Sequence, residues 1–379
     1  LDCRLFKMYK KILDLLIAGL LMSLAWTLRG QFGHLKGALI PGAAAAILAA
    51  SLGRDSSWRI SFGRSVILGA LGFSLGGHFS YGKLIENILA SQIPNQVELL
   101  RIFLIGFLWG GLGGSFLGFG FSEKPIRFAD CTLFGFLGLF WIIPLGIMNL
   151  ESLDLLLYGA GLVVLHLYNS AVKKSLAVFV FGFAAAVGFG LGFLFSVLIL
   201  WLGSKGFFPG GLAFWTLRDQ EWGFWGGVSL LFAVRILERL ECFPAKWYGF
   251  PDFEKEGYIF LTVLAPALLT FHVVLYWLKV RAPFLAEGKF IGVSAGLVFL
   301  FMTLWLLWLK TRGQLFYKRE RIFVLSTLFF IWYLSFLAAA KEVALFGRGR
   351  WEAAYTIFIA SAVFLTALLP LKVYSNLKR

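Results

Sequence analysis

Residues 102–121 read IFLIGFLWGGLGGSFLGFGF, a stretch of large apolar residues and glycines that contains no charged side chain. A helix needs about 20 predominantly apolar residues to cross the hydrocarbon core of a bilayer. Glycine weakens a soluble helix, but between membrane helices it lets two backbones approach closely. The stretch therefore predicts a membrane-crossing helix with close neighbours, either in a static bundle or between helices that move.

The composition of the whole chain extends this prediction. Of its 379 residues, 59% are hydrophobic and 15% are charged, whereas soluble domains carry about 25% charged residues. So much apolar surface must face lipid. The formal net charge of +15 is typical of Lys and Arg on cytoplasmic loops. We expect no nucleic-acid partner, because no basic run outside the apolar segments is interleaved with aromatic residues.

Apolar runs of spanning length recur along the chain and predict an all-α, polytopic transmembrane helical bundle of about twelve spans. The predicted spans are 11–28, 37–53, 65–82, 102–121, 130–149, 154–171, 175–202, 212–237, 258–278, 290–309, 322–340 and 353–371. The second is short and rich in alanine, so it either crosses the membrane or re-enters it.

The distribution of positive charge predicts that both termini lie in the cytoplasm. With the N-terminus inside, Lys and Arg fall on inner segments nearly twice as often as on outer segments, as the positive-inside rule requires. Cys3, Cys131 and Cys242 all lie in or beside predicted cytoplasmic segments, where thiols stay reduced. We expect a multi-pass protein surrounded by membrane lipids, in a bacterial inner (plasma) membrane.

A short motif occurs twice, roughly half the chain apart. Residues 26–31 read WTLRGQ and residues 215–220 read WTLRDQ. One interpretation is a six-plus-six duplication into halves 1–174 and 175–379, related by a pseudo-two-fold axis along the membrane normal. The other is chance in a biased composition. The first motif ends a predicted span whereas the second begins one, so a simple alignment of the halves fails there.

The first motif continues into a polar segment, 29–37, on the predicted outer side. Arg29, Gln31, His34 and Lys36 alternate there with glycines. Arginine offers a planar fork of donors to a carboxylate or phosphate, and histidine changes protonation near neutral pH. The segment is either a substrate-binding element or an ordinary solvated loop with turn glycines.

Two further groups of polar residues lie near the same side. His78, at the outer end of the third predicted span, is either a substrate-binding residue near His34 or a hydrogen-bonded structural group. The second motif carries Arg218, Asp219, Gln220 and Glu221 into the outer part of the eighth span. Ionisable residues within a bundle are functional candidates.

The second group has two interpretations. In one, Arg218 and Gln220 bind substrate while Asp219 or Glu221 carries a proton. In the other, the residues form a self-paired structural cluster.

The familiar motifs of soluble enzymes are absent. The sequence contains no phosphate-binding glycine loop, no nucleophile-elbow serine and no cysteine pair at metal spacing, so it assigns no catalytic residue, no metal and no cofactor. His166 and His272 are too few for a convincing haem site. Residues 238–257 form the longest predicted loop, which is either an interfacial connector or a docking site for partner subunits.

One loop resembles a known transporter class. Gly53, Asp55, Gly63 and Arg64 lie between the second and third predicted spans. In this they resemble the loop that latches the two halves of major-facilitator-type secondary transporters, although the spacing is longer here. The twelve-span topology is similar to that class too. The resemblance implies alternating access around a central site.

Taken together, these patterns predict a secondary transporter of a small anionic solute, bound by one arginine from each half. A membrane-embedded transferase acting on a lipid-linked phosphate is an alternative, because Arg29, His34, Lys36 and His78 have the chemistry to clamp phosphate. A non-catalytic membrane subunit of a larger complex is another.

Overall fold

The computed structural model describes most of the first 244 residues of the chain. These are residues 3–29, 37–79, 81–124, 126, 128–141, 154–207 and 214–244. The last four predicted spans lie outside the described residues. So do Gln31, His34 and Lys36, and most of the 238–257 loop.

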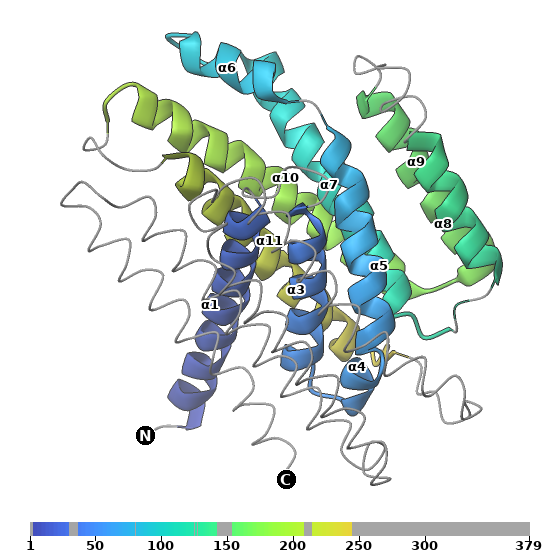
Figure 1. The fold of residues 1–379 in the computed structure, drawn as a ribbon. Coiled ribbons are helices and arrows are strands. Elements are labelled where there is room, and N and C mark those ends of the chain that lie inside the picture. Colours follow the sequence, from blue (N-terminus) through green and yellow to red (C-terminus); the bar gives the residue numbers. More distant parts are fainter. Residues whose placement is uncertain are drawn as a thin grey trace, which may run out of the picture.

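Every regular element in the described part of the chain is a helix (Figure 1). The elements are α1 (Cys3–Arg29), α3 (Leu39–Leu52), α4 (Ser56–Ile60), α5 (Phe62–Leu75), η1 (Gly76–His78), α6 (Gly82–Ala90), α7 (Gln96–Gly120), α8 (Phe128–Trp141), α9 (Asp154–Tyr168), the π-helical turn η4 (Asn169–Lys173), α10 (Leu176–Ser204) and α11 (Phe214–Arg239). The first eight predicted spans each coincide with one of the longer helices, which confirms the helical class for this part.

Length and apolar composition single out three helical segments that are able to cross a membrane. They are Gln96–Gly120, Asp154–Lys173 and Leu176–Ser204. The apolar helices Leu39–Leu52 and Arg64–Leu75 are shorter. These properties are compatible with a membrane protein, while the count of twelve spans and the orientation stay predictions.

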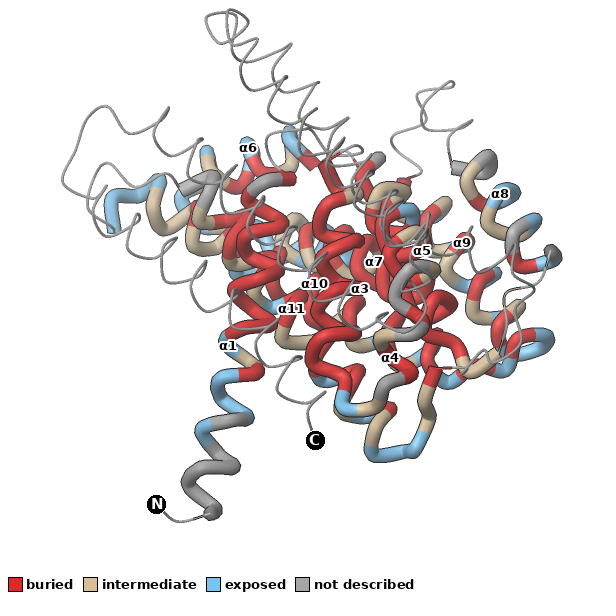
Figure 2. The backbone as a smooth tube through the Cα atoms, turned by 60° about the horizontal axis from the view of Figure 1, so that its bottom comes forward, coloured by how far each residue is buried: buried red, intermediate tan, exposed pale blue. Residues whose placement is uncertain are grey.

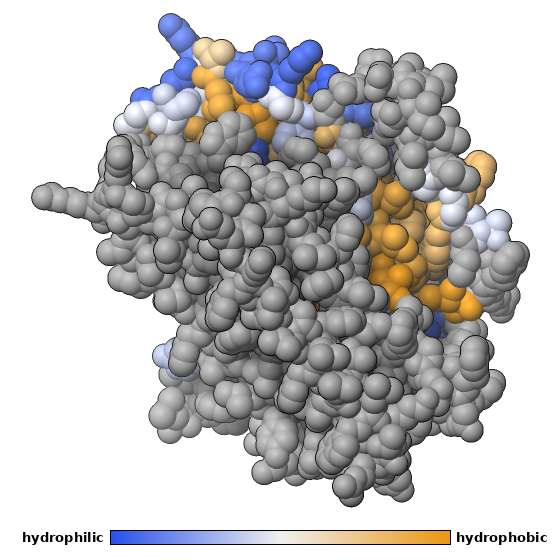
Figure 3. All heavy atoms as spheres, in the orientation of Figure 1, coloured by the Kyte–Doolittle hydropathy of each residue, from blue (hydrophilic) through white to orange (hydrophobic). Residues whose placement is uncertain are grey.

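The exposed surfaces of the described helices differ in the same sense, because some are apolar and one is hydrophilic. Leu71, Phe136 and Leu156 are exposed apolar side chains of α5, α8 and α9, and Figure 3 shows an apolar surface on the side where these helices lie. The short helix α6, which lies between the third and fourth predicted spans, exposes Lys83 and Glu86 and is hydrophilic in the same view.

Glycines on one face of α7 set its distance from α10. Gly106, Gly110, Gly114 and Gly118 follow one another at four-residue intervals. A Cβ atom at each would overlap a backbone carbonyl oxygen of α10, namely that of Phe189, Ala185, Phe181 and Ala177 respectively. The two helices are therefore antiparallel and nearly in backbone contact, the arrangement that small residues permit in membranes. The close neighbours that the glycine-rich stretch predicts are therefore present, while its crossing of a membrane stays a prediction.

Other glycines bring α1 against α11 in the same way. A Cβ at Gly223 would meet the backbone of Met22, and one at Gly227 would overlap the carbonyl of Ala18. Ser23 also donates a hydrogen bond from its hydroxyl to the Gln220 carbonyl, at 2.7 Å. Figure 2 shows the buried core running through α1, α3, α7, α10 and α11. Helices from both predicted halves share this core, and the division into halves stays a prediction.

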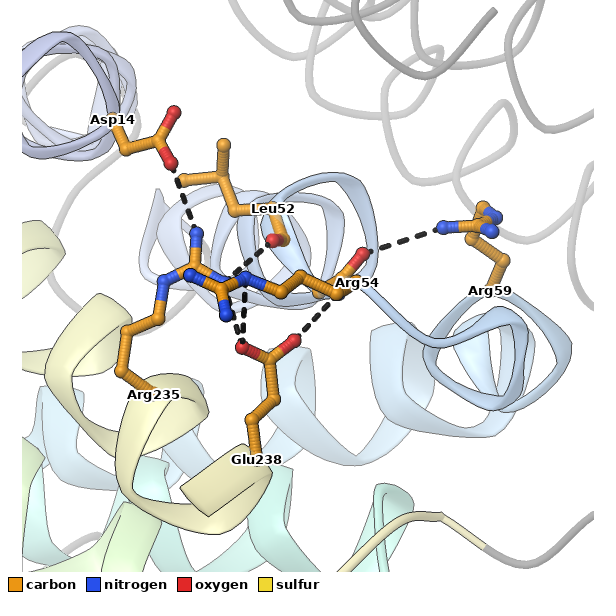
Figure 4. A network of polar contacts seen from close by, with 7 residues as sticks. Asp14, Leu52, Arg54, Arg59, Arg235 and Glu238 are labelled. Atoms are coloured by element: carbon orange, nitrogen blue, oxygen red, sulfur yellow. Dashed lines mark hydrogen bonds and ion pairs between the residues drawn. The ribbon is translucent and has the colours of Figure 1, made fainter. Parts of the chain in front are cut away.

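A network of charged residues ties α1, α3 and α11 together far from Arg29 (Figure 4). Arg235 donates to Asp14 at 2.9 Å, to Glu238 at 2.7 Å and to the carbonyl of Leu52 at 3.1 Å. The backbone N–H of Arg54 donates to Glu238 at 2.5 Å. We call these five residues the Arg235 network. In this network the buried Asp14 carboxylate on α1 pairs with the Arg235 guanidinium on α11.

The loop that resembles a transporter latch is held by local hydrogen bonds. The Asp55 side chain accepts a hydrogen bond from the Ser57 N–H at 2.7 Å and thereby caps α4. Arg64 donates to the carbonyls of Gly120 and Ser122, where α7 ends. A cation there satisfies carbonyls left without helical partners and opposes the negative end of the helix dipole.

A substitution on the α7 glycine face tests the close packing. Gly110→Ala places a Cβ against the Ala185 carbonyl, so it should destabilise the protein by about 1–3 kcal/mol through overpacking. The measurement is the unfolding midpoint of purified protein in detergent. Gly159→Ala on α9 is the matched control, since nothing lies within 4 Å of its Cβ position. Equal stability of the two variants would contradict the α7–α10 contact.

Removal of the central arginine tests the Arg235 network. Arg235→Gln takes the guanidinium away from the buried Asp14 carboxylate, and we expect a loss of about 2–3 kcal/mol, below the cost of breaking a fully buried pair. Arg54→Gln should change stability by less than about 1 kcal/mol, because the Arg54 side chain is 74% exposed and the hydrogen bond at 2.5 Å comes from its backbone. The measurement is chemical denaturation of both variants. Equal losses of stability would contradict the role assigned to Arg235.

Candidate functional site

The arginines of the two repeated motifs meet at one place. Arg29 is the last residue of α1, and Arg218 lies near the start of α11. Because the two helices run antiparallel, the end of one faces the beginning of the other. Both arginines are buried, with 1% and 7% of their surface exposed. The juxtaposition explains why the first motif ends a helix while the second begins one.

A single carboxylate lies between the two guanidinium groups. Oδ1 of Asp219 accepts hydrogen bonds from Nε and Nη2 of Arg218, at 3.1 and 2.7 Å. The same oxygen is 3.8 Å from Nη1 of Arg29. Two cations therefore share one anion, and the three side chains carry a net charge of +1. Charge-assisted contacts of this kind are stronger than neutral hydrogen bonds.

Indole rings enclose the Arg29 guanidinium. Its central carbon lies 5.1 Å from the ring centroid of Trp26, 4.9 Å from that of Trp109 and 5.6 Å from that of Trp222. Its Nη2 donates to the hydroxyl of Tyr81 at 2.9 Å. A desolvated cation over an aromatic face gains about 2 kcal/mol. The rings thus offset part of the cost of removing this charge from water. We call this group, with Arg218 and Asp219, the Arg29 cluster.

The three indole N–H groups of the Arg29 cluster differ in their hydrogen bonding. The indole nitrogens of Trp26 and Trp222 are buried without a hydrogen-bond partner among the described residues, whereas that of Trp109 donates to the Phe73 carbonyl at 2.7 Å. The Trp26 and Trp222 rings lie 4.2 Å apart, centroid to centroid. Buried donors are normally satisfied, so the cluster is able to accept an anion.

The remaining predicted site residues lie in different surroundings. Gln220 is buried, and its backbone carbonyl accepts from Ser23. Glu221 is partly buried, and its Oε2 has no hydrogen-bond partner among the described residues. Residues two apart on a helix do not face each other, so Glu221 points away from Asp219. His78 ends η1, but its side chain lies outside the description.

The segments chosen from the sequence include Arg29, Arg218 and Asp219, but several other residues of the cluster were not singled out. The prediction named His78 from the segment 76–82, whereas Tyr81 of that segment contacts Arg29. It also passed over Trp26, Trp109 and Trp222. A tryptophan one turn before Arg29, and another one turn after Arg218, were available signals, since i and i+3 or i+4 side chains share a helix face. Nothing in the sequence pointed to Trp109.

The copies of the motif occupy opposite ends of antiparallel helices. They are therefore not in equivalent positions of their helices, although they adjoin in space. The duplication stays a prediction, because its remaining helices lie outside the described residues. The sequence also left open a self-paired structural cluster at residues 218–221. One such pair is present, because Arg218 forms an ion pair with its neighbour Asp219.

Two other polar side chains, the buried Asp130 and the half-buried His166, contact polar groups of the described residues. Asp130 accepts from Lys173 and from the Tyr168 hydroxyl, both at 2.6 Å. His166, weighed above as a haem ligand, has its Nε2 3.2 Å from the Ser115 hydroxyl and stacks on Phe179. Within the described ranges, no three His, Cys, Asp or Glu side chains gather as metal ligands would. The Arg29 cluster is thus the described site best suited to a charged ligand.

Comparison of the chain with protein-family models, with curated proteins and with solved structures finds no match. What the site does must therefore follow from its own residues.

Proposed function

We propose that this protein is a multi-pass integral membrane protein that transports a small anionic solute by alternating access. The observation that carries the proposal is the convergence of Arg29 and Arg218 on one carboxylate in a buried site. Buried guanidinium groups interact strongly with anions, because little water screens their charge.

The donor groups support the same class of ligand. Arginine pairs with carboxylates and phosphates through two parallel hydrogen bonds. The buried indole N–H groups of Trp26 and Trp222 add two donors. We assign substrate binding to Arg29 and Arg218. As further binding residues we propose Gln31, His34, Lys36, His78 and Gln220.

The arrangement of α1 and α11 supports alternating access. The Arg29 cluster joins these helices at one end, and the Arg235 network joins them at the other. Asp14 and Arg29 are fifteen positions apart on α1, a rise of about 22 Å at 1.5 Å per residue. Contacts at both ends of one helix pair are what a carrier has to break in turn. Proton coupling through Asp219 or Glu221 stays a prediction.

Uptake by reconstituted protein tests the transport function. In liposomes challenged with mono- and dicarboxylates, phosphate and sulfate, Arg218→Lys should lower uptake of the transported anion at least about tenfold, because lysine keeps the charge but loses the two-pronged contact. Arg29→Ala should lower it further. Arg54→Ala is the control, since that exposed side chain lies outside the Arg29 cluster. Uptake equal to wild type in both cluster variants, with unfolding midpoints unchanged, would sink the proposal.

Chemical labelling tests the proposed orientation. In a Cys3→Ser/Cys131→Ser variant, a membrane-impermeant maleimide should modify Cys242 in inside-out vesicles and spare it in right-side-out vesicles. Burial raises the pKa of the Cys242 thiol, and the nearby Glu123 carboxylate raises it further. The reactive thiolate is therefore scarce at neutral pH, and labelling should accelerate as the pH is raised above the usual range for cysteine. Preferential labelling in right-side-out vesicles would reverse the topology.

A further inference from the structure

Two indole N–H groups of the Arg29 cluster lack the acceptor that a buried donor normally has. The Trp26 and Trp222 side chains are fully buried, and neither Nε1 has a hydrogen-bond partner among the described residues. Trp109, whose ring contacts both of theirs, donates its own N–H to the Phe73 carbonyl. An unpaired buried donor is destabilising, and a bound ligand that accepts from Trp26 and Trp222 would remove that cost.

The aromatic rings around these donors restrict the kind of ligand. Trp222 stacks on Phe193 with the ring centroids 4.2 Å apart, and Trp26 lies 5.5 Å from Phe189. The face of an aromatic ring is negative and its edge is positive, so an indole presents its N–H edge to an anion. Phenylalanine rings have no polar group with which to replace the water that an ion loses on entry. The site therefore favours an anion that gives up its water at little cost.

From these donors and their surroundings we infer that Trp26 and Trp222 donate hydrogen bonds directly to the solute. The solute is a small monovalent inorganic anion that holds water weakly, of the class of nitrate and thiocyanate. The inference rests on the transport function proposed above, and it adds two ligand residues and a solute class. Sulfate and hydrogen phosphate carry more charge and hold their water more firmly, so they bind poorly among apolar rings.

Binding of a hydration series tests the solute class. Full-length protein, purified in detergent and buffered with HEPES without inorganic anions, is titrated calorimetrically with sodium thiocyanate, nitrate, chloride and sulfate at equal ionic strength. We expect affinity to rise from sulfate through chloride to nitrate and thiocyanate, with nitrate at least about tenfold tighter than sulfate. Sulfate binding as tight as nitrate binding would overturn the class.

Tryptophan-to-phenylalanine variants test the two donors, because phenylalanine keeps an aromatic ring and removes the N–H. Trp26→Phe and Trp222→Phe should each weaken nitrate binding at least about tenfold, the loss expected for one hydrogen bond to a charged acceptor. Trp225→Phe is the control on the same helix as Trp222, since Trp225 is 38% exposed and lies outside the Arg29 cluster. Wild-type affinity in both Trp26→Phe and Trp222→Phe would refute the donor roles.

Stability in the absence of inorganic anions gives a readout that does not depend on affinity. Trp26→Phe, Trp222→Phe and Trp109→Phe each remove the same ring volume from a fully buried side chain. Only Trp109→Phe also leaves the Phe73 carbonyl without its donor. We expect Trp109→Phe to lower the unfolding midpoint by about 2 °C or more beyond the other two variants. Equal losses in all three would mean that the Trp26 and Trp222 donors are already satisfied, which overturns the inference.

Flux measurements in liposomes separate the inference from the function on which it rests. Nitrate uptake that falls in Trp26→Phe and Trp222→Phe but not in Trp225→Phe supports both. Nitrate binding that needs the two donors, without flux of any anion, supports the binding site and removes the transport function. Uptake of carboxylate or phosphate that is unaffected by Trp26→Phe and Trp222→Phe leaves transport standing and refutes the inference.

Discussion

The close approach of helix backbones through glycine is the constraint on which the rest of this structure depends. Lipid tails are as apolar as the side chains that face them, so membrane helices gain little by hiding apolar surface from lipid and associate mainly through tight packing. Gly223 and Gly227 allow α11 to lie against Met22 and Ala18 of α1. That contact fixes the register of the helix pair. The register in turn places the start of α11 beside Arg29.

The register of α1 and α11 buries the guanidinium groups of Arg29 and Arg218, and this burial determines which contacts the Arg29 cluster needs. Two guanidinium groups enter a site almost closed to solvent, and each needs compensation for its lost water. Asp219 supplies it for both, and the indole rings of Trp26, Trp109 and Trp222 supply more for Arg29. The cluster thus combines ion pairing with cation–π contacts.

The two charged groups of the α1–α11 pair differ in this respect. In the Arg235 network, one guanidinium is matched by carboxylates on both sides, Asp14 and Glu238, and by a backbone carbonyl. The Arg29 cluster instead joins two guanidinium groups to one carboxylate and contains two indole N–H groups that have no acceptor among the described residues. Among the described residues, the two ends of the helix pair therefore contain different proportions of guanidinium and carboxylate groups.

The sequence by itself determined the helical class, the positions of the described helices and the two segments that carry Arg29 and Arg218. These features follow from local runs of apolar residues and from charged residues that are costly to bury in a membrane. Both are visible in the linear sequence. Only the tertiary structure decided that the two arginines share Asp219, that Tyr81 contacts Arg29, and that Trp109 of α7 belongs to the Arg29 cluster. Those partners come from helices far apart in the chain. The glycine contacts set the register of these helices, and the spacing of the polar residues does not reveal that register.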